Sequence, residues 1–157
     1  MSEIVRLENL LGRYISIRDR SELEVRRYLQ RKLHDGEDEN IIDVLVEKYK
    51  RLGYIDDSRT AASFVHSLIS SKAKGQAYIK AKLSSLGISK EDISNALREV
   101  SEEDLFAAME KRLQKAKGRI AKQPSNLQRA KTYQVLFSSG FSSSEISRFL
   151  DETAKKR

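Results

Sequence analysis

Apolar residues recur at intervals of three and four along most of this chain, which is the spacing of one face of an α-helix. In the stretch 3–18, for example, Ile4, Leu7 and Leu11 share a stripe. No stretch of comparable length alternates between apolar and polar residues, as a strand with one buried face would. The pattern therefore predicts an all-α protein.

Helix starts are marked by serines that have an acidic residue three positions later, which is the pattern of a capping box. Such serines stand at 21, 89, 101 and 142. We expect each serine to cap the amide groups of a new helix. The chain is thus divided into several short helices.

The stretch 52–65 predicts a tight corner between two helices. Gly53 can adopt the left-handed conformation that closes a helix, and either Asp56 or Asp57 can cap the next one. Tyr54 and Ile55 stand in the turn, where we expect them to staple the two helices together.

The same arrangement of segments occurs three times. Gly36, Gly87 and Gly140 are spaced 51 and 53 residues apart, and each precedes an isoleucine by five or six positions. We expect each glycine to end the second helix of a unit that has one longer helix and two shorter ones. Such units bury their apolar faces against their neighbours, which predicts three tandem three-helix repeats in an elongated, curved array. The units span about 3–52, 57–99 and 101–153.

The length of 157 residues suits a single domain, 1–157. Hydrophobic residues make up 39% and charged residues 34%, which is typical of a helical protein in aqueous solution. The absence of cysteine excludes disulfides and thiolate chemistry. The apolar runs are too short for a membrane span or a secretion signal, so we expect a cytoplasmic protein without a membrane partner.

The formal net charge is +7, and the basic residues are unevenly distributed. The stretches 58–90 and 111–144 contain no acidic residue. In a repeat array, equivalent basic positions would line up as a positive strip, which favours a long anionic partner such as nucleic acid or a nucleoprotein filament. An ordinary solvated face is the other interpretation. The candidate contacts are Arg26, Arg27, Arg31, Lys32, Lys74, Lys80, Lys82, Lys115, Lys117, Arg119, Lys122, Arg129 and Lys131.

Residues that could support catalysis are sparse. His34 and His66 have no second metal ligand at a suitable spacing. The Asp56–Asp57 pair could bind a divalent ion, but helix capping explains it better because adjacent side chains point apart. Phosphate-binding loops and nucleophile motifs are absent. We therefore expect no catalytic residue, no cofactor and no metal, and hence no enzyme.

Three tyrosines, Tyr28, Tyr78 and Tyr133, lie near the apolar faces of the helices that follow the long ones. They could stack on nucleic-acid bases. A tyrosine at the margin of the core, with its hydroxyl in water, is the simpler interpretation.

Four motifs taken together resemble the RecX family, the bacterial modulators of the RecA recombinase. They are Ser-x-x-Glu-Val-Arg-Arg at 21–27, Ile-Asp-Asp-x-Arg-x-Ala at 55–61, Lys-Gly-x-x-x-Ile-x-x-x-Leu-x-x-x-Gly-Ile at 74–88 and Gly-Phe-Ser at 140–142. The resemblance covers nearly the whole chain. The chain departs from the family pattern at Thr60, where an aromatic residue is usual, and at Ser139, where a basic residue is usual. Ser21 also stands further from Gly36 than is typical.

The resemblance implies tandem three-helix repeats and a non-enzymatic protein that binds active RecA filaments on single-stranded DNA, in their helical groove. RecX-like proteins generally inhibit filament extension, ATP hydrolysis, strand exchange and RecA's coprotease activity toward the LexA repressor, although some act positively. The expected function is therefore modulation, mostly inhibition, of RecA in DNA recombination, DNA repair and the SOS response. The basic residues would dock a monomer on the filament and touch DNA phosphates.

Two alternatives remain open from the residues alone. The chain could be a helical module that binds nucleic acid without sequence preference. It could also be a scaffold that recognises an acidic surface of another protein. Tighter binding to RecA-coated than to bare single-stranded DNA would separate the filament hypothesis from the first alternative.

Overall fold

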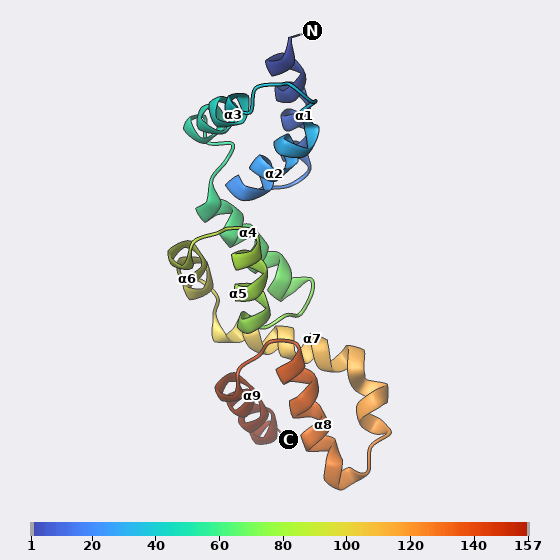
Figure 1. The fold of residues 1–157 in the computed structure, drawn as a ribbon. Helices are drawn as coiled ribbons and strands as arrows, with labels where there is room; N and C mark the ends of the chain where they lie inside the picture. Colours follow the sequence, from blue (N-terminus) through green and yellow to red (C-terminus); the bar gives the residue numbers. More distant parts are fainter. Residues whose placement is uncertain (1, 157) are drawn as a thin grey trace. The chain divides into compact units, whose positions relative to one another are not determined.

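The computed structural model describes residues 2–156, and within this range the chain forms nine α-helices and no strand (Figure 1). The predicted all-α class is confirmed. The helices are α1 (Glu3–Ile17), α2 (Glu22–Lys32), α3 (Asn40–Arg51), α4 (Asp57–Ser70), α5 (Gln76–Ser85), α6 (Lys90–Arg98), α7 (Glu102–Ala121), α8 (Ser125–Ser138) and α9 (Ser143–Lys155).

The helices form three tandem sets of three, as the sequence predicts. We call α1–α3, α4–α6 and α7–α9 repeats 1, 2 and 3. The first helix of each repeat is the longest, with 15, 14 and 20 residues respectively. Within the described residues, none of the helices combines the length and hydrophobicity that a membrane crossing needs.

The predicted serine caps are present. Ser21 and Ser142 form complete capping boxes with Glu24 and Glu145. Ser101 accepts a hydrogen bond from the amide of residue 104, but the return bond of a full box is not formed there. Residue 104 is an aspartate, whose side chain is one carbon shorter than that of glutamate, so it reaches back less far.

The corner before α4 follows the prediction with one refinement. Gly53 has φ +83°, and Asp56 accepts a hydrogen bond from the Arg59 amide, so Asp56 rather than Asp57 is the cap. Ile55 is buried, whereas Tyr54 is 57% exposed, so the staple is mainly Ile55.

The prediction that Gly36 ends α2 is wrong, because the helix stops at Lys32 and Gly36 lies in the following loop with φ +84°.

The chain comprises two compact units. Unit 1 contains the residues up to Ser63 together with Leu83–Ile93, and unit 2 contains Phe64–Lys82 together with the chain from Ser94 onward. Repeat 1 therefore belongs to unit 1 and repeat 3 to unit 2. The three helices of repeat 2 contribute residues to both units.

Each unit has its own set of buried apolar residues. In unit 1, α1, α2 and α3 meet at a core cluster that Ile55 also joins. In unit 2, α7, α8 and α9 bury one face each. The cluster of unit 1 comprises Leu7, Leu11, Val25, Leu29, Ile42, Leu45, Val46 and Ile55; the buried residues of repeat 3 include Leu105, Ala108, Met109, Ala116, Val135, Leu136, Phe141, Ile146 and Phe149.

Unit 1 contains a close contact between the turn after α5 and the start of α2. The Ser21 hydroxyl donates to the carbonyl oxygen of Leu86 at 2.6 Å. Gly87, the next residue, has φ +76°, and a Cβ on it would lie 2.7 Å from the Cβ of Leu23. Glycine is therefore required there both by its conformation and by the lack of space.

Unit 2 repeats this contact one repeat later. The Gly75 amide donates to the carbonyl of Ser139 at 2.8 Å, and the Ala77 amide donates to that of Gly140 at 3.0 Å. A Cβ on Gly75 would lie only 2.3 Å from the carbonyl carbon of Gly140. In both units the turn after the second helix of one repeat thus meets the start of the second helix in the preceding repeat. We call this contact the repeat junction.

The departures from the family pattern at Thr60 and Ser139 are structurally accommodated. Thr60 is fully buried and its hydroxyl donates to the carbonyl of Arg20 at 3.2 Å. The Ser139 hydroxyl accepts from Arg112 Nε at 2.8 Å, so a basic side chain still reaches this turn, although it comes from α7.

Candidate functional site

The basic residues expected to bind an anionic partner differ in how far their charges are already neutralised. Arg26 on α2 is paired with two acids: its Nε lies 3.0 Å from Glu22 Oε2, and its Nη1 lies 2.7 Å from Asp43 Oδ1. The hydrogen bond to Asp43 is the main cause that raises the pKa of Arg26 above its ordinary value. Arg26 is therefore the candidate with the least charge to offer a partner.

Two candidate lysines cover the rings of neighbouring tyrosines. Lys32 Nζ lies 5.6 Å from the ring centre of Tyr28, and Lys74 Nζ lies 4.8 Å from that of Tyr78. The Tyr28 ring also stacks on Tyr14, with ring centres 4.0 Å apart. Such rings are already occupied by contacts within the chain. The exposed candidates of α2 also include Arg27 and Arg31, and those of α5 are Lys80 and Lys82.

Most candidates in α7, in α8 and at Lys122 between them have no polar partner among the described residues. Five of them are exposed, and their side chains form no hydrogen bond or ion pair with another described residue. Lys131 is half-buried and donates to Gln134. Residues 111–144 contain no acid, so no carboxylate within this stretch competes for these charges. The five are Lys115, Lys117, Arg119, Lys122 and Arg129.

These five cations do not share one face. Lys115 and Lys117 are two residues apart on α7, which puts them on opposite sides of a helix with 3.6 residues per turn. Lys115, Arg119 and Lys122 follow the i, i+4, i+7 spacing of a single side. We call these three the basic face. Lys117 and Arg129 instead line a pocket between α7, α8 and α9.

Few of the basic candidates stand at equivalent positions in the repeats, whereas the expected strip would require most of them to do so. The buried residues Val25 and Leu29 on α2 correspond to Ile79 and Leu83 on α5. In this register Arg26 corresponds to Lys80. The other candidates of α2, Arg27, Arg31 and Lys32, correspond to the uncharged residues Ala81, Ser85 and Leu86.

Two further basic residues of the stretch 111–144 form hydrogen bonds that connect different segments of the chain. Lys111 Nζ donates to the carbonyls of Ser70 and Ser71, at 2.9 and 3.3 Å, and so ties α7 to the end of α4. Arg112 binds the Ser139 hydroxyl in the repeat junction. Sequence alone does not separate these structural cations from free ones.

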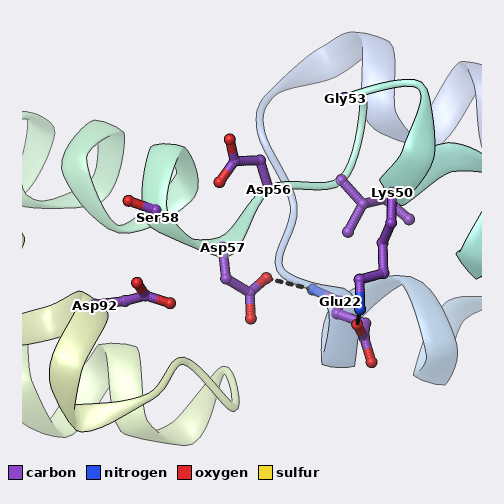
Figure 2. Close-up of a pocket in the computed structure, with 8 residues that line it drawn as sticks. Glu22, Lys50, Gly53, Asp56, Asp57, Ser58 and Asp92 are labelled. Atoms are coloured by element: carbon purple, nitrogen blue, oxygen red, sulfur yellow. Dashed lines mark hydrogen bonds and ion pairs between the residues drawn. The ribbon is translucent and has the colours of Figure 1, made fainter.

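An acidic pocket of about 350 Å³ in unit 1 was not expected from the sequence (Figure 2). Asp57 at the start of α4 accepts a hydrogen bond from the Glu22 amide at 2.8 Å, and Lys50 Nζ lies 2.9 Å from Glu22 Oε1. Asp92 of α6 also lines the pocket. These residues are far apart in the sequence, so only the Asp56–Asp57 pair gave any signal.

The pKa values of two acids in this pocket, Glu22 and Asp57, are shifted in opposite directions. The hydrogen bond from Lys50 is the largest cause that lowers the pKa of Glu22. Burial is the largest cause that raises the pKa of Asp57, and the negative charges of Glu22 and Asp92 add to it. Within the described residues, no group of three or more His, Cys, Asp or Glu could hold a metal ion. Through the hydrogen bond between Asp57 and the Glu22 amide, the pocket joins the starts of α2 and α4.

Comparison with known families identifies the repeat. A family model described as RecX, second three-helix domain, matches residues 56–97. This stretch covers α4, α5 and nearly all of α6, which form repeat 2.

Several relatives carry the name regulatory protein RecX. The protein of Geobacillus sp. strain WCH70 is 33% identical over 137 residues, which cover 87% of this chain and 49% of the relative. That of Halalkalibacterium halodurans is 31% identical over 144 residues, covering 92% and 53%. That of Escherichia fergusonii is 39% identical over 101 residues, covering 60% of each. This chain spans about half of the length of the first two relatives.

Solved structures share the fold. A crystal structure of regulatory protein RecX superposes with a TM-score of 0.81 at 27% identity, covering 94% of this chain and 73% of the other. RecX from Lactobacillus salivarius superposes with a TM-score of 0.81 at 25% identity, covering 95% of each chain. The three-helix repeats, the family-model match, the relatives and these structures together support assignment to the RecX family.

Proposed function

We propose that this chain binds the RecA filament on single-stranded DNA, in the helical groove, and modulates RecA activity, most often by inhibiting it. The name regulatory protein, which relatives in several bacteria carry, supports a regulatory role. The chain would act as a cytoplasmic monomer, and it would act by binding rather than by catalysis.

The observation that carries this proposal is the group of five exposed cations from Lys115 to Arg129, which no acid among the described residues neutralises. Unpaired cations attract a polyanion over several ångströms, and the attraction weakens as salt screens it. A filament that carries single-stranded DNA presents phosphates in a regular row. The basic face of α7 can therefore dock the chain by charge alone, without a sequence preference.

The proposed contacts keep the full set of basic candidates, but their contributions should differ. Arg26 contributes least, because Glu22 and Asp43 already neutralise it. The basic face contributes most. The set comprises Arg26, Arg27, Arg31, Lys32, Lys74, Lys80, Lys82, Lys115, Lys117, Arg119, Lys122, Arg129 and Lys131.

The test reverses two charges of the basic face, Lys115→Glu and Lys122→Glu, in one variant. We expect the variant to require about tenfold more protein for half-maximal inhibition of DNA-dependent ATP hydrolysis by RecA, because like charges then face the phosphates. The measurement is the rate of ATP hydrolysis by RecA on single-stranded DNA as the protein is titrated. A matched variant with Lys117→Glu and Arg129→Glu changes the net charge equally but on another surface.

Equal losses in the two variants would contradict the proposal that the basic face contributes more than the contacts at Lys117 and Arg129. Unchanged inhibition by the Lys115→Glu and Lys122→Glu variant would contradict it directly. The wild-type titration at two salt concentrations completes the experiment, since inhibition must weaken at the higher one.

The alternative function is a helical module that binds nucleic acid without sequence preference. The same unpaired cations favour it, because phosphate contacts alone suffice for such binding. Fluorescence anisotropy with labelled oligo(dT), bare or coated with RecA, separates the two functions. Equal affinity for both forms favours the alternative, and clear preference for the coated form favours RecA modulation.

A further inference from the structure

Repeat 3 contains an open pocket of about 640 Å³ between α7, α8 and α9. We call it the third-repeat groove. Leu113 and Ile120 of α7, with Phe149 and Leu150 of α9, supply its apolar surface. Phe149 is only 4% exposed and forms the floor, whereas the other three are partly exposed.

The groove exists because repeat 3 has a polar residue at a position that is apolar in the other repeats. Ile88 and Phe141 donate their amides to Leu83 and Leu136, which aligns α5 with α8. One turn earlier, Ile79 of α5 therefore corresponds to Thr132 of α8. Ile79 is fully buried, whereas Thr132 is partly exposed and lines the groove.

The neighbouring helix shows the same difference. Ile42, Ile93 and Ile146 are equivalent in the third helices, so Val46 and Leu97 correspond to Leu150. Val46 and Leu97 are buried, whereas Leu150 is partly exposed in the groove. The apolar surface that repeats 1 and 2 bury is thus left accessible in repeat 3.

One end of the groove is positively charged. Lys117 and Arg129 line it, and neither side chain forms a hydrogen bond or ion pair with another described residue. The nearby start of α8 has no acidic residue in its first turn and no side-chain cap, so its amide groups add positive potential. The acid in the lining, Glu110, lies seven residues before Lys117, which is about 10 Å along the helix.

We propose that the third-repeat groove binds a peptide segment of a partner protein, one that carries apolar side chains next to carboxylates. The apolar side chains would cover Leu113, Ile120 and Leu150, and the carboxylates would pair with Lys117 and Arg129. This is the way in which amphipathic segments occupy hydrophobic grooves.

The lining favours a peptide over nucleic acid. A nucleic acid can satisfy the two cations, but its sugars and phosphates leave an aliphatic surface uncovered. Its bases bind best on exposed aromatic rings. The one aromatic ring in the lining, that of Phe149, is buried and packs edge-on against Phe106, with ring centres 5.5 Å apart.

The experiment measures binding of a fluorescein-labelled synthetic peptide to the full chain by fluorescence anisotropy. The probe has 14 residues, with leucine at positions i, i+3, i+4 and i+7 and glutamate at most others. We expect saturable binding that the Lys117→Glu and Arg129→Glu variant weakens at least tenfold. The Lys115→Glu and Lys122→Glu variant, which has the same net charge, should change binding less than twofold.

A second variant tests the groove without changing any charge. Thr132→Ile places in α8 the side chain that Ile79 supplies in α5, and it should fill part of the groove. We expect weaker peptide binding by at least tenfold together with a higher melting temperature. Circular dichroism of each variant verifies that the helices are retained.

Three outcomes would overturn the proposal: no saturable binding, equal weakening by both charge-reversal variants, or full binding by Thr132→Ile. Displacement of the peptide by oligo(dT) would assign the groove to nucleic acid instead. A dimer in sedimentation that Thr132→Ile dissociates would assign it to a second copy of this chain. The assay contains neither RecA nor DNA-bound filament, so its failure leaves the proposed function untouched.

Discussion

Gly75 and Gly118 occupy opposite environments. Gly75 directly precedes α5, and Gly118 lies inside α7. Around Gly75, backbone atoms of the α8–α9 turn fill the place where a Cβ would stand, with the Gly140 carbonyl carbon 2.3 Å away. Around Gly118, inside α7, nothing lies within 4 Å of that place. A side chain is therefore excluded at one position and freely accommodated at the other.

This difference predicts opposite effects of the same substitution. Gly75→Ala should lower the free energy of unfolding by about 1–3 kcal/mol, because backbone must move to admit the methyl group. Gly118→Ala should raise it by about 0.5–1 kcal/mol, because alanine loses less conformational freedom in a helix. Urea denaturation followed by circular dichroism measures both values. Equal effects of the two substitutions would contradict the close backbone contact at the repeat junction.

At the scale of elements, two helices begin with the same complete capping box but differ in one contact. Ser21 starts α2 and Ser142 starts α9, and each accepts a hydrogen bond from the amide three residues on. Ser21 is also fully buried and donates to the Leu86 carbonyl. The pair therefore separates the energy of a cap from the energy of the repeat junction.

Ser142→Ala should lower the free energy of unfolding by about 1 kcal/mol, which is typical for loss of an N-cap. Ser21→Ala should cost about 2 kcal/mol, because the Leu86 carbonyl then loses its donor as well. Thermal and urea unfolding of both variants provide the comparison. If Ser21→Ala is no more destabilising than Ser142→Ala, the side-chain hydrogen bond at the junction contributes nothing to stability.

The sequence predicted the elements well, because helix caps and apolar spacing are local signals. It located Ser21 and Ser142 as complete boxes and the corner at Gly53. It failed at Gly36, because a loop separates this glycine from the end of α2. A left-handed glycine is required by both a helix end and a loop, so residue type alone does not distinguish them.

At the scale of the whole chain, unit 1 contains a set of carboxylates with shifted pKa values. Contacts with Lys48, Lys50 and the His34 amide are the main causes that lower the pKa values of Glu8, Glu22 and Glu37 from 4.5. A lowered pKa stabilises the folded state above pH 4.5, and this stabilisation is lost as the pH falls through the folded-state value. Asp57, with its raised pKa, opposes the trend, since its protonation favours the folded state.

We therefore expect the melting temperature to fall as the pH decreases below about 4.5, since three groups outweigh one. Glu22→Gln should make the decrease of the melting temperature with falling pH shallower. Asp57→Asn should make it steeper, and the asparagine keeps an oxygen that can accept from the Glu22 amide. Scanning calorimetry between pH 7 and pH 3 measures the three slopes. Identical slopes would show that these side chains do not control stability in acid.

The candidate site was less predictable than the fold. The number of basic residues does not reveal which of them form ion pairs within the chain or which surface each side chain faces. The sequence placed Arg26 and Lys117 in one class, but Arg26 is neutralised by residues of α2 and α3, while Lys117 faces the third-repeat groove. The acidic pocket brings Glu22, Asp57 and Asp92 together from three helices. Proximity of that kind arises only from tertiary structure.

The repeat junction also bears on how such proteins diverge. Its central contacts in unit 2 join main-chain atoms, so they demand glycine at positions 75 and 140 and little else from the neighbouring sequence. Mutations can then accumulate elsewhere while the architecture persists, in keeping with a TM-score of 0.81 at 25–27% identity. Searches by shape, or by paired glycines at repeat spacing, should consequently detect distant homologues that ordinary sequence alignment overlooks.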